Sequence, residues 1–263
     1  MSASIVAVGA GRMGRGIAMA YAIRGQRVTV VDFKPREASQ FQALHHDIDQ
    51  ELNTALRQLA DLDLFEAAQI DVIRQRIQVV DLAHAGQALE TAGIIYEGVP
   101  ETLDAKRDAL NRICKDAPGT AIIASTTSTM LASELAGMVS CPERFMNAHW
   151  LNPAYVIPLV EISAHDQTSP QALAALKESL TGIGKVPVQC ACSPGFIVPR
   201  LQTLIMNEAA RMVEEGVATV EEIDRATRYG LGFRFASIGV LEFIDYGGND
   251  ILYHASHYLS DNL

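Results

Sequence analysis

The feature that most constrains the fold is a glycine pattern between two short apolar segments at the start of the chain. The first segment ends at Val8 and leads into the turn G-A-G-R-M-G at residues 9–14, and the second ends at Val31 and is followed by Asp32. The alanine-rich stretch between them has the composition of a helix. A strand, a glycine-rich turn, a helix and a second strand in this order predict a βαβ unit that binds a dinucleotide.

Each glycine of this turn has a physical role. Gly9 permits the tight turn, Gly11 lets the backbone approach a pyrophosphate, and Gly14 lets the helix pack closely on the strand. The helix that follows offers unpaired N–H groups and a partial positive charge to the phosphates. We therefore predict that the cofactor-binding turn consists of Gly9, Gly11, Arg12, Met13 and Gly14.

Asp32 indicates which dinucleotide is bound. It lies 23 residues after Gly9, close to the spacing of about 20 residues expected for the acid that binds the ribose hydroxyls. A carboxylate there accepts hydrogen bonds from a 2′-hydroxyl and repels a 2′-phosphate, so the sequence predicts NAD rather than NADP. The positive charges of Lys34 and Arg36 would weaken the repulsion of a 2′-phosphate. Because Pro35 is predicted to start a helix, however, Arg36 is expected on the surface.

Composition limits the class of protein. A length of 263 residues suggests one large or two ordinary domains, and the net charge of −10 argues against partners such as nucleic acid or an anionic membrane. Because the first residues lead directly into a predicted strand, we expect no signal peptide, and no stretch has the length of a membrane span. The four cysteines have neither zinc-site nor disulfide spacing, so we expect reduced thiols, no metal site and a cytoplasmic location.

The middle of the chain continues the alternation of strands and helices. Apolar residues at helical spacing over 41–59, and a short helix near 65–76, predict a helical insertion. Further strands are predicted at 77–80, 93–97 and 121–124. Glu97 ends one of these strands, at the edge where parallel sheets bind ligands. We predict that it either lines the nicotinamide pocket or is a solvated loop acid.

Five consecutive hydroxyl residues, 125–129, follow the strand predicted at 121–124. In such a run Ser128 or Thr129 can cap the next helix by accepting a hydrogen bond from its backbone. On the residues alone, capping is favoured over catalysis.

Two polar residues stand where apolar strands are predicted. His149 ends one apolar segment, and Glu161 lies inside another. A buried carboxylate is costly unless it is paired and hydrogen-bonded, and a histidine twelve residues earlier, across a turn at Asn152-Pro153, is a suitable partner. Such a carboxylate fixes the tautomer of the histidine and raises its basicity. We predict a catalytic pair, and the alternative is a histidine satisfied in the core.

After the sequence Ser193-Pro194-Gly195 the pattern is helical throughout. Alternating strands and helices followed by helices alone predict an α/β fold with two domains. We predict a Rossmann-type NAD-binding domain over residues 1–190 and a smaller all-α domain over 191–263. These last helices form too small a unit to bury their apolar stripes alone, so we expect a homodimer through residues beyond about 195.

The sequence resembles the 3-hydroxyacyl-CoA dehydrogenase family over nearly its whole length. The resemblance is carried by the turn at 9–14, Asp32, the run at 125–129, the motif His149-x-x-Asn152-Pro153, Glu161 and Pro194-Gly195-Phe196. It implies an NAD-binding domain followed by a helical domain that dimerises. By position it implies that His149 is the general base and Glu161 its paired acid, with Ser128 and Asn152 in the active site. For Ser128 it favours catalysis over capping.

Other details resemble the branch of lambda-crystallin (L-gulonate 3-dehydrogenase) and carnitine dehydrogenase, which act on free hydroxy acids. These details lie at residues 152–161, 230–234 and 238–242. Two substrates therefore stay open, each oxidised at a 3-hydroxyl to the 3-keto compound. One is a short 3-hydroxyacyl-CoA such as 3-hydroxybutyryl-CoA, which the family as a whole favours, and the other is a free 3-hydroxy acid. Arg57, Arg74 and Arg76 are candidates to contact CoA phosphates, or are ordinary surface charges.

One position departs from the family pattern. Pro199 stands where the family has an active-site asparagine. Proline cannot supply that amide, and deep in a helix it would remove a backbone hydrogen bond. This departure keeps open an alternative of another class, a non-catalytic NAD-binding structural protein.

Overall fold

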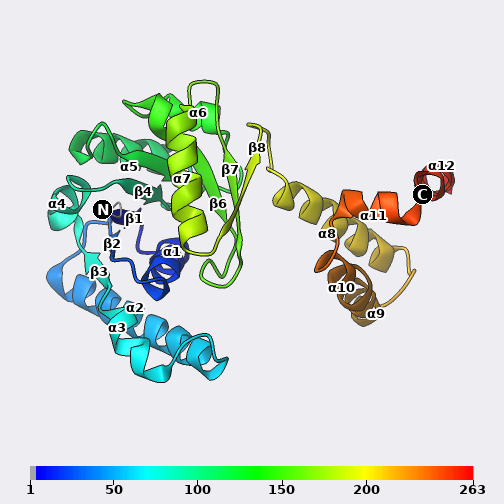
Figure 1. Cartoon of the computed structure of the whole chain (residues 1–263), viewed down its shortest axis with the longest axis horizontal. Coiled ribbons are helices and arrows are strands. Elements are labelled where there is room, and N and C mark those ends of the chain that lie inside the picture. Colours follow the sequence, from blue (N-terminus) through cyan, green and yellow to red (C-terminus); the bar gives the residue numbers. More distant parts are fainter. Residues whose placement is uncertain (1–3, 263) are drawn as a thin grey trace. The chain divides into compact units, whose positions relative to one another are not determined.

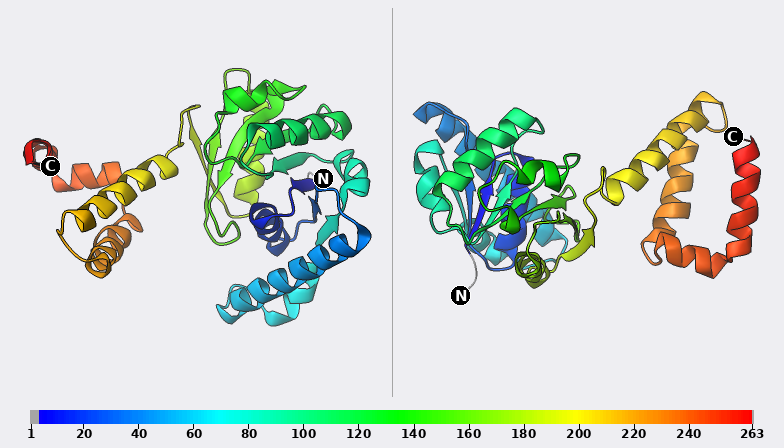
Figure 2. Two further views of the ribbon diagram at one scale, coloured as in Figure 1. Left: turned by 180° about the vertical axis from the view of Figure 1, so that it is seen from behind. Right: turned by 90° about the horizontal axis from the view of Figure 1, so that it is seen from above.

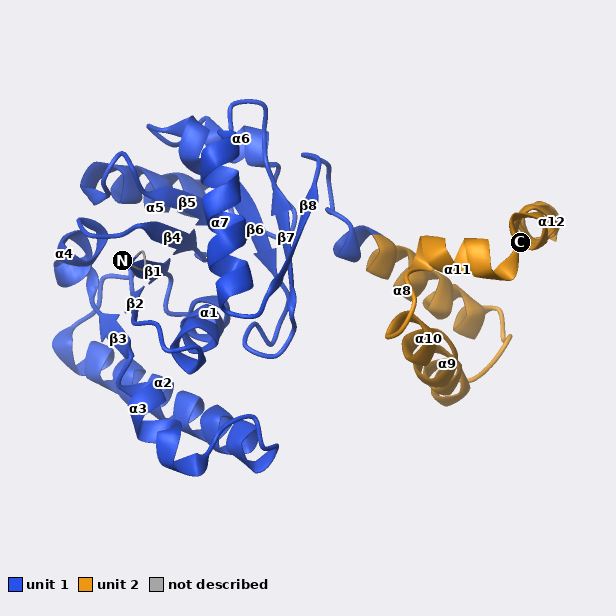
Figure 3. Ribbon diagram, viewed as in Figure 1, with its two compact units in different colours: residues 1–200 blue, residues 201–263 orange. Residues whose placement is uncertain are grey.

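The computed structural model describes residues 4–262. Contacts between residues divide the chain into two compact units, 1–200 and 201–263 (Figure 3). Among the described residues, no helix is both long and apolar enough to cross a membrane. The domain boundary predicted near residue 190 stays a prediction.

Unit 1 is built on a mixed sheet whose strands are ordered β3-β2-β1-β4-β5-β6-β7-β8 in residues 4–200 (Figure 1). The strands are β1 (Ile5–Val8), β2 (Val28–Val31), β3 (Ile77–Val80), β4 (Ile94–Glu97), β5 (Ile122–Ser125), β6 (Phe145–Trp150), β7 (Leu159–Ser163) and β8 (Val186–Cys190). Neighbouring strands are parallel except β6 and β7, which are antiparallel. The predicted α/β fold is confirmed.

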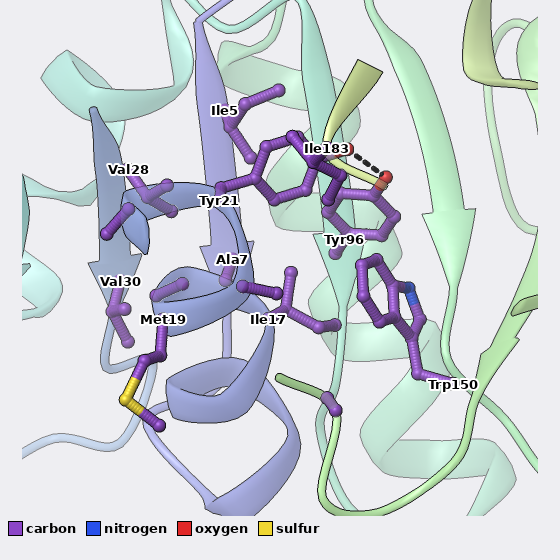
Figure 4. Packing of buried hydrophobic residues seen from close by; sticks show 14 of the residues in the cluster. Ile5, Ala7, Ile17, Met19, Tyr21, Val28, Val30, Tyr96, Trp150 and Ile183 are labelled. Carbon is purple, nitrogen blue, oxygen red and sulfur yellow. Dashed lines mark hydrogen bonds between the residues drawn. The ribbon is translucent and has the colours of Figure 1, made fainter. Parts of the chain in front are cut away.

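Helices cover both faces of this sheet (Figure 2). The helices of unit 1 are α1 (Arg12–Ile23), α2 (Ala38–Asp61), α3 (Ile70–Arg74), α4 (Ala85–Leu89), α5 (Leu103–Asp116), α6 (Ala132–Ala136) and α7 (Pro170–Gly182). Apolar residues of α1, α2, α3 and α7 belong to the core on one face, and those of α4, α5 and α6 to the core on the other. An aromatic group of Tyr21, Tyr96 and Trp150 lies in the first core, where the two tyrosine hydroxyls are 2.6 Å apart (Figure 4).

The insertion between β2 and β3 is helical, as predicted, but its first helix starts later than Pro35. Helix α2 begins at Ala38, where Glu37 and Gln40 form a capping box that satisfies free N–H groups at the helix end. Arg36 is exposed, as predicted, although the helix predicted to start at Pro35 starts later. Arg36 belongs to the segment that joins β2 to α2, and its side chain turns to Asp32.

The described residues of unit 2 form helices and no strand, which confirms the predicted all-α part. Its helices are α8 (Val198–Glu214), α9 (Val220–Ala226), the π-helical turn Thr227–Gly232, α10 (Phe233–Phe235), α11 (Val240–Gly247) and α12 (Asn249–Asn262). Pro199 is the second residue of α8, so it does not lie deep in a helix. Because N–H groups in the first turn have no partner within a helix, proline costs no hydrogen bond there.

Candidate active site

A cleft of about 420 Å³ lies where β1, β2 and β4 end. Its walls include Gly9 and Gly11 of the glycine turn, Asp32 and Arg36 after β2, and Gly98 after β4. Three parallel strands thus bring their carboxyl ends to one ligand-sized space, which is where sheets of this kind bind nucleotides.

The glycine turn has the shape that a dinucleotide requires. Gly9 has a φ of +106°, and a Cβ atom there would lie 2.6 Å from the carbonyl oxygen of Gly98. A Cβ atom on Gly14 would lie 2.0 Å from the carbonyl oxygen of Gly9, so only glycine lets α1 approach the turn. Nothing lies within 4 Å of a Cβ built on Gly11, which leaves its backbone open. The residues present fit a bound pyrophosphate.

The Asp32 carboxylate in the cleft wall is paired with a positive charge. It is only 3% exposed, and its Oδ2 accepts a hydrogen bond from Nε of Arg36, while Oδ1 accepts the backbone N–H of Lys34 at 3.3 Å. The ion pair with Arg36 neutralises the carboxylate and places a second charged group in the cleft wall. The sequence pattern missed this pair because the helix was predicted to start three residues too early.

The other residues predicted in the cofactor turn lie elsewhere. Met13 is half-buried against the core. Arg12 lines a separate cavity together with Asn152. The structure therefore brings Gly9, Gly11 and Asp32 together in the cleft, with Gly14 packed behind them.

Glu97 is fully buried, so the alternative of a solvated loop acid is wrong. Its Oε1 accepts hydrogen bonds from Nζ of Lys106 at 3.0 Å and the backbone N–H of Val99 at 2.8 Å, and its Oε2 accepts one from Ser125 at 2.6 Å. Lys106 is itself 1% exposed. These bonds satisfy the buried charges and fix the backbone where β4 and β5 end.

Glu101 accepts hydrogen bonds from the hydroxyl-rich segment 127–129, which follows β5. Its Oε1 accepts hydrogen bonds from the hydroxyls of Thr127 and Thr129 and from the backbone N–H groups of Ser128 and Thr129. These bonds, with Lys106 nearby, keep the pKa of Glu101 below its ordinary value although burial raises it. Glu101 thus fixes the position of the Ser128 backbone.

The capping interpretation of Ser128 and Thr129 is wrong. Helix α6 starts at Ala132, its cap residue is Leu131, and no side chain caps it. The Ser128 hydroxyl forms no hydrogen bond with any residue in the described range 4–262. It therefore remains available to a ligand.

His149 and Glu161 stand directly opposite each other on the antiparallel strands β6 and β7. Nδ1 of His149 lies 2.8 Å from Oε2 of Glu161, which confirms the predicted contact. Oε1 of Glu161 accepts the backbone N–H groups of Ile197 and Val198 at 2.9 and 2.8 Å. The ring of Phe196 stacks on His149 at 5.2 Å between centroids.

This pairing fixes the chemistry available to His149. Since a carboxylate only accepts, Nδ1 carries the proton donated to Glu161, and Nε2 is left with a lone pair. Nε2 has no partner among the described residues. The arrangement is that of a general base whose positive form would be stabilised by the buried acid.

Asn152 lies in the hairpin 151–158 that joins the strands of this pair. It is exposed, and its bond to Pro153 is cis. On the inner side of the hairpin, Nζ of Lys185 donates hydrogen bonds to the carbonyl oxygens of Ala154 at 2.6 Å and Ile157 at 2.8 Å. Lys185 therefore fixes the hairpin that carries Asn152.

Lys185 is a buried ammonium group without an acidic partner. It is 7% exposed, lies 5.5 Å from the centre of the Trp150 ring, and forms no ion pair with a carboxylate in residues 4–262. Burial, and secondly the charge of Arg24, lower the pKa of Lys185 from 10.5 to about 8.

We expect stability to depend on this group at alkaline pH. The folded state loses the proton near pH 8 and the unfolded chain near 10.5, so the cost of burying the charge is fully present below pH 8 and is relieved as the pH rises. The free energy of unfolding of the wild type should therefore gain about 1–3 kcal/mol from this group as the pH rises. Urea denaturation of Lys185→Met should lack this gain. A difference between wild type and variant that stays constant from about pH 7.5 to 10 would contradict this expectation.

Sequence reasoning did not single out Glu101, Lys106 or Lys185. One signal was present, because Lys106 shares the buried face of α5 with Ala109, Leu110 and Ile113. A lysine at an apolar position of a helical stripe indicates a buried partner. Lys185 gave no such signal, since its partners are backbone carbonyls.

Known proteins resemble this chain over its whole length. Residues 4–193 match the family model "3-hydroxyacyl-CoA dehydrogenase, NAD binding domain", and residues 195–263 match "3-hydroxyacyl-CoA dehydrogenase, C-terminal domain". Lambda-crystallin of Oryctolagus cuniculus is 31% identical, over 97% of this chain and 77% of its own length. L-carnitine dehydrogenase of Pseudomonas putida is 39% identical, over 62% of this chain and 51% of its own.

A third relative matches in sequence and in structure. The 5-formyl-3-hydroxy-2-methylpyridine 4-carboxylate 5-dehydrogenase of Mesorhizobium japonicum is 30% identical over 100% of this chain and 82% of its own. A crystal structure of an enzyme of this kind, described as NAD+ dependent, has a TM-score of 0.86 at 30% identity, with the same coverage of both chains. The chain belongs to the 3-hydroxyacyl-CoA dehydrogenase family of NAD-dependent dehydrogenases, which act on hydroxyl groups.

Proposed function

We propose that this protein catalyses the reversible, NAD-dependent oxidation of a 3-hydroxy compound to the 3-keto compound, with His149 as the base. The observation that carries the proposal is the buried His149–Glu161 pair, joined at 2.8 Å on facing strands. A general base held in one tautomer by a carboxylate is the group that removal of a hydroxyl proton requires.

The steps follow from these contacts. NAD, when bound, supplies the acceptor for the hydride that leaves the alcohol carbon. Nε2 of His149 takes the hydroxyl proton, so that the C–O bond becomes a carbonyl, and Glu161 stabilises the imidazolium. The free hydroxyl of Ser128 and the amide of Asn152 hold the substrate oxygen.

The cofactor is assigned to the cleft at residues 9–14. Gly9, Gly11 and Gly14 form the pyrophosphate turn, and Asp32 takes the ribose hydroxyls. Arg12, Met13 and Glu97 are the further cofactor residues predicted from the sequence. They are not in the lining of this cleft: Arg12 lines the neighbouring cavity, Met13 packs against the core and Glu97 is fully buried. We also propose residues 1–190 as the NAD-binding domain and 191–263 as the helical domain, in a cytoplasmic protein.

Two substrate classes fit this chemistry. A short 3-hydroxyacyl-CoA is the class in the family's name. A free 3-hydroxy acid is favoured by a specific observation: Arg74 and Arg76, candidates for CoA phosphates, donate instead to the carbonyl oxygens of Ile77 at 2.6 Å and Ala22 at 2.9 Å. Arg57 alone of the three has no such bond among the described residues.

The proposed function is tested by incubating the protein and NAD with a panel of 3-hydroxy compounds, both CoA thioesters and free acids, and recording NADH absorbance. We expect turnover of at least one class. Tight NAD binding without turnover of any member would instead favour the non-catalytic, structural alternative.

The cofactor preference gives a second expected result. NAD should exceed NADP in kcat/KM by roughly 10- to 100-fold, the worth of a charged hydrogen bond. Asp32→Ala should narrow this gap, because it releases Arg36 to bind a 2′-phosphate, and Asp32→Ala with Arg36→Gln should not gain activity with NADP. Steady-state kinetics with both cofactors decides this, and equal efficiency in the unmodified protein would refute the preference.

The third expected result concerns the oligomeric state. Large apolar side chains of unit 2 are exposed, such as Phe233 at 79% and Leu241 at 77%. Exposed apolar surface of this kind favours association of identical chains. We expect light scattering to report a dimer at micromolar concentration, and Leu241→Asp to shift it towards monomer. A monomer in the unmodified protein would refute the proposal.

A further inference from the structure

A small cavity adjoins the cofactor cleft. It measures about 200 Å³ and lies between α1, α2 and the hairpin 151–158. Its wall includes Arg12 and Arg15 of α1, Glu51 of α2, and Asn152 and Tyr155 of the hairpin. Arg15 also lines the cofactor cleft, so the two spaces are neighbours.

The charges of this cavity do not cancel. Arg15 donates from Nε to the carbonyl oxygen of Ala10 at 2.8 Å and from Nη1 to Glu51, which neutralises it. Arg12 forms neither a hydrogen bond nor an ion pair with any residue between 4 and 262. Because an arginine is always charged, the cavity keeps one positive charge and a planar donor group that has no acidic partner among the described residues.

A CoA thioester would make little use of this charge. The carbonyl carbon two bonds from its reacting centre belongs to an uncharged thioester, and its phosphates lie at the far end of the pantetheine arm. A free hydroxy acid has a carboxylate two bonds from the carbon that loses hydride. A guanidinium binds a carboxylate through two parallel hydrogen bonds.

We propose that this cavity binds the carboxylate of a free 3-hydroxy acid, with Arg12 as the anion-binding residue and Asn152 between it and the reacting carbon. This inference rests on the proposed function and names its substrate class. It also gives Arg12 a different role from the one predicted on the glycine turn, where it belonged to the cofactor site.

The test compares three forms of one compound: 3-hydroxybutyrate, its methyl ester and its CoA thioester. With the intact protein and NAD, kcat/KM for the acid should exceed that for the methyl ester by roughly 10- to 100-fold, the loss expected when a charged hydrogen bond is removed. The thioester should be no better than the methyl ester.

Arg12→Met then removes the charge at nearly constant length. It should lower kcat/KM for the acid by roughly 10- to 100-fold, mainly through KM, and leave the methyl ester unchanged. Arg12→Lys should restore part of the loss. Arg27→Met is the matched control, because Arg27 is exposed and lies before β2.

Two binding measurements complete the test. Calorimetry should give the same Kd for NAD in wild type and Arg12→Met, and quenching of NADH fluorescence by acetoacetate should weaken in the variant. A weaker Kd for NAD in Arg12→Met would make Arg12 a cofactor residue and overturn the inference. Turnover of the thioester alone would overturn it too, while the proposed function stands. With no turnover at all, Arg12-dependent binding of acetoacetate would still support the anion site, although the proposed function would fail.

Discussion

His149→Gln is expected to lower turnover by roughly 10²–10⁴-fold, the usual worth of general acid–base catalysis, without a change in NAD affinity. Glutamine fills a similar space and can still bond to Glu161, but it has no basic nitrogen to take the hydroxyl proton. Because His149 lies on β6 and the glycine turn follows β1, cofactor binding should be separate from this loss.

Stopped-flow or steady-state NADH absorbance measures the turnover, and calorimetry measures NAD binding. His46→Gln is the matched control, since His46 is exposed on α2 and, among residues 4–262, its side chain bonds to Gln50 alone. If His149→Gln kept near-full activity, the base would lie elsewhere and the proposed mechanism would be wrong.

Glu161 gives the second large effect, and two variants separate its charge from its hydrogen bonds. Glu161→Gln keeps a carbonyl oxygen for the N–H groups of Ile197 and Val198, so the protein should fold. It loses the charge that stabilises the imidazolium and the acceptor that fixes the histidine tautomer, so turnover should fall by roughly 10²–10⁴-fold. NADH absorbance measures this loss.

Glu161→Ala should also destabilise the fold, because it leaves His149, Ile197 and Val198 without their buried acceptor. We expect a loss of about 3–5 kcal/mol in the free energy of unfolding, measured by urea denaturation. Glu90→Ala, at an exposed position, is the control. Unchanged turnover in Glu161→Gln, or unchanged stability in Glu161→Ala, would contradict the role assigned to this acid.

The parts of the fold that sequence predicts well are those set by local pattern. The βαβ unit at residues 4–32, the helical insertion and the final helices all follow from apolar spacing and glycine, and the structure confirms them. The contact between His149 and Glu161 also followed, because a buried acid needs a partner and a turn lies between the two.

The parts that sequence missed depend on contacts between distant segments or on one cap. The capping box at Glu37 moved the start of α2 and turned Arg36 towards Asp32. The bonds of Glu101 to the loop after β5 replaced the predicted cap at Ser128. The capping box is a local pattern of residues three apart, whereas the bonds of Glu101 depend on which side chains the completed sheet brings together.

Pro199 illustrates how a helix boundary changes an interpretation. Deep in a helix it would have marked a lost hydrogen bond, whereas in the first turn of α8 it is a residue that suits its position. What it cannot supply is an amide side chain, so Asn152 and Ser128 are left as the polar groups proposed to hold the substrate oxygen.

The central claim is hydride transfer from a 3-hydroxy carbon to NAD, and isotope transfer tests it most directly. Deuterium is placed at C3 of the free acid, the methyl ester and the CoA thioester, and the NADH formed is analysed by mass spectrometry. We predict that NADH carries the deuterium from at least one of these compounds, and that His149→Gln forms it far more slowly. NADH without deuterium, or no NADH from any of the three, would contradict the account.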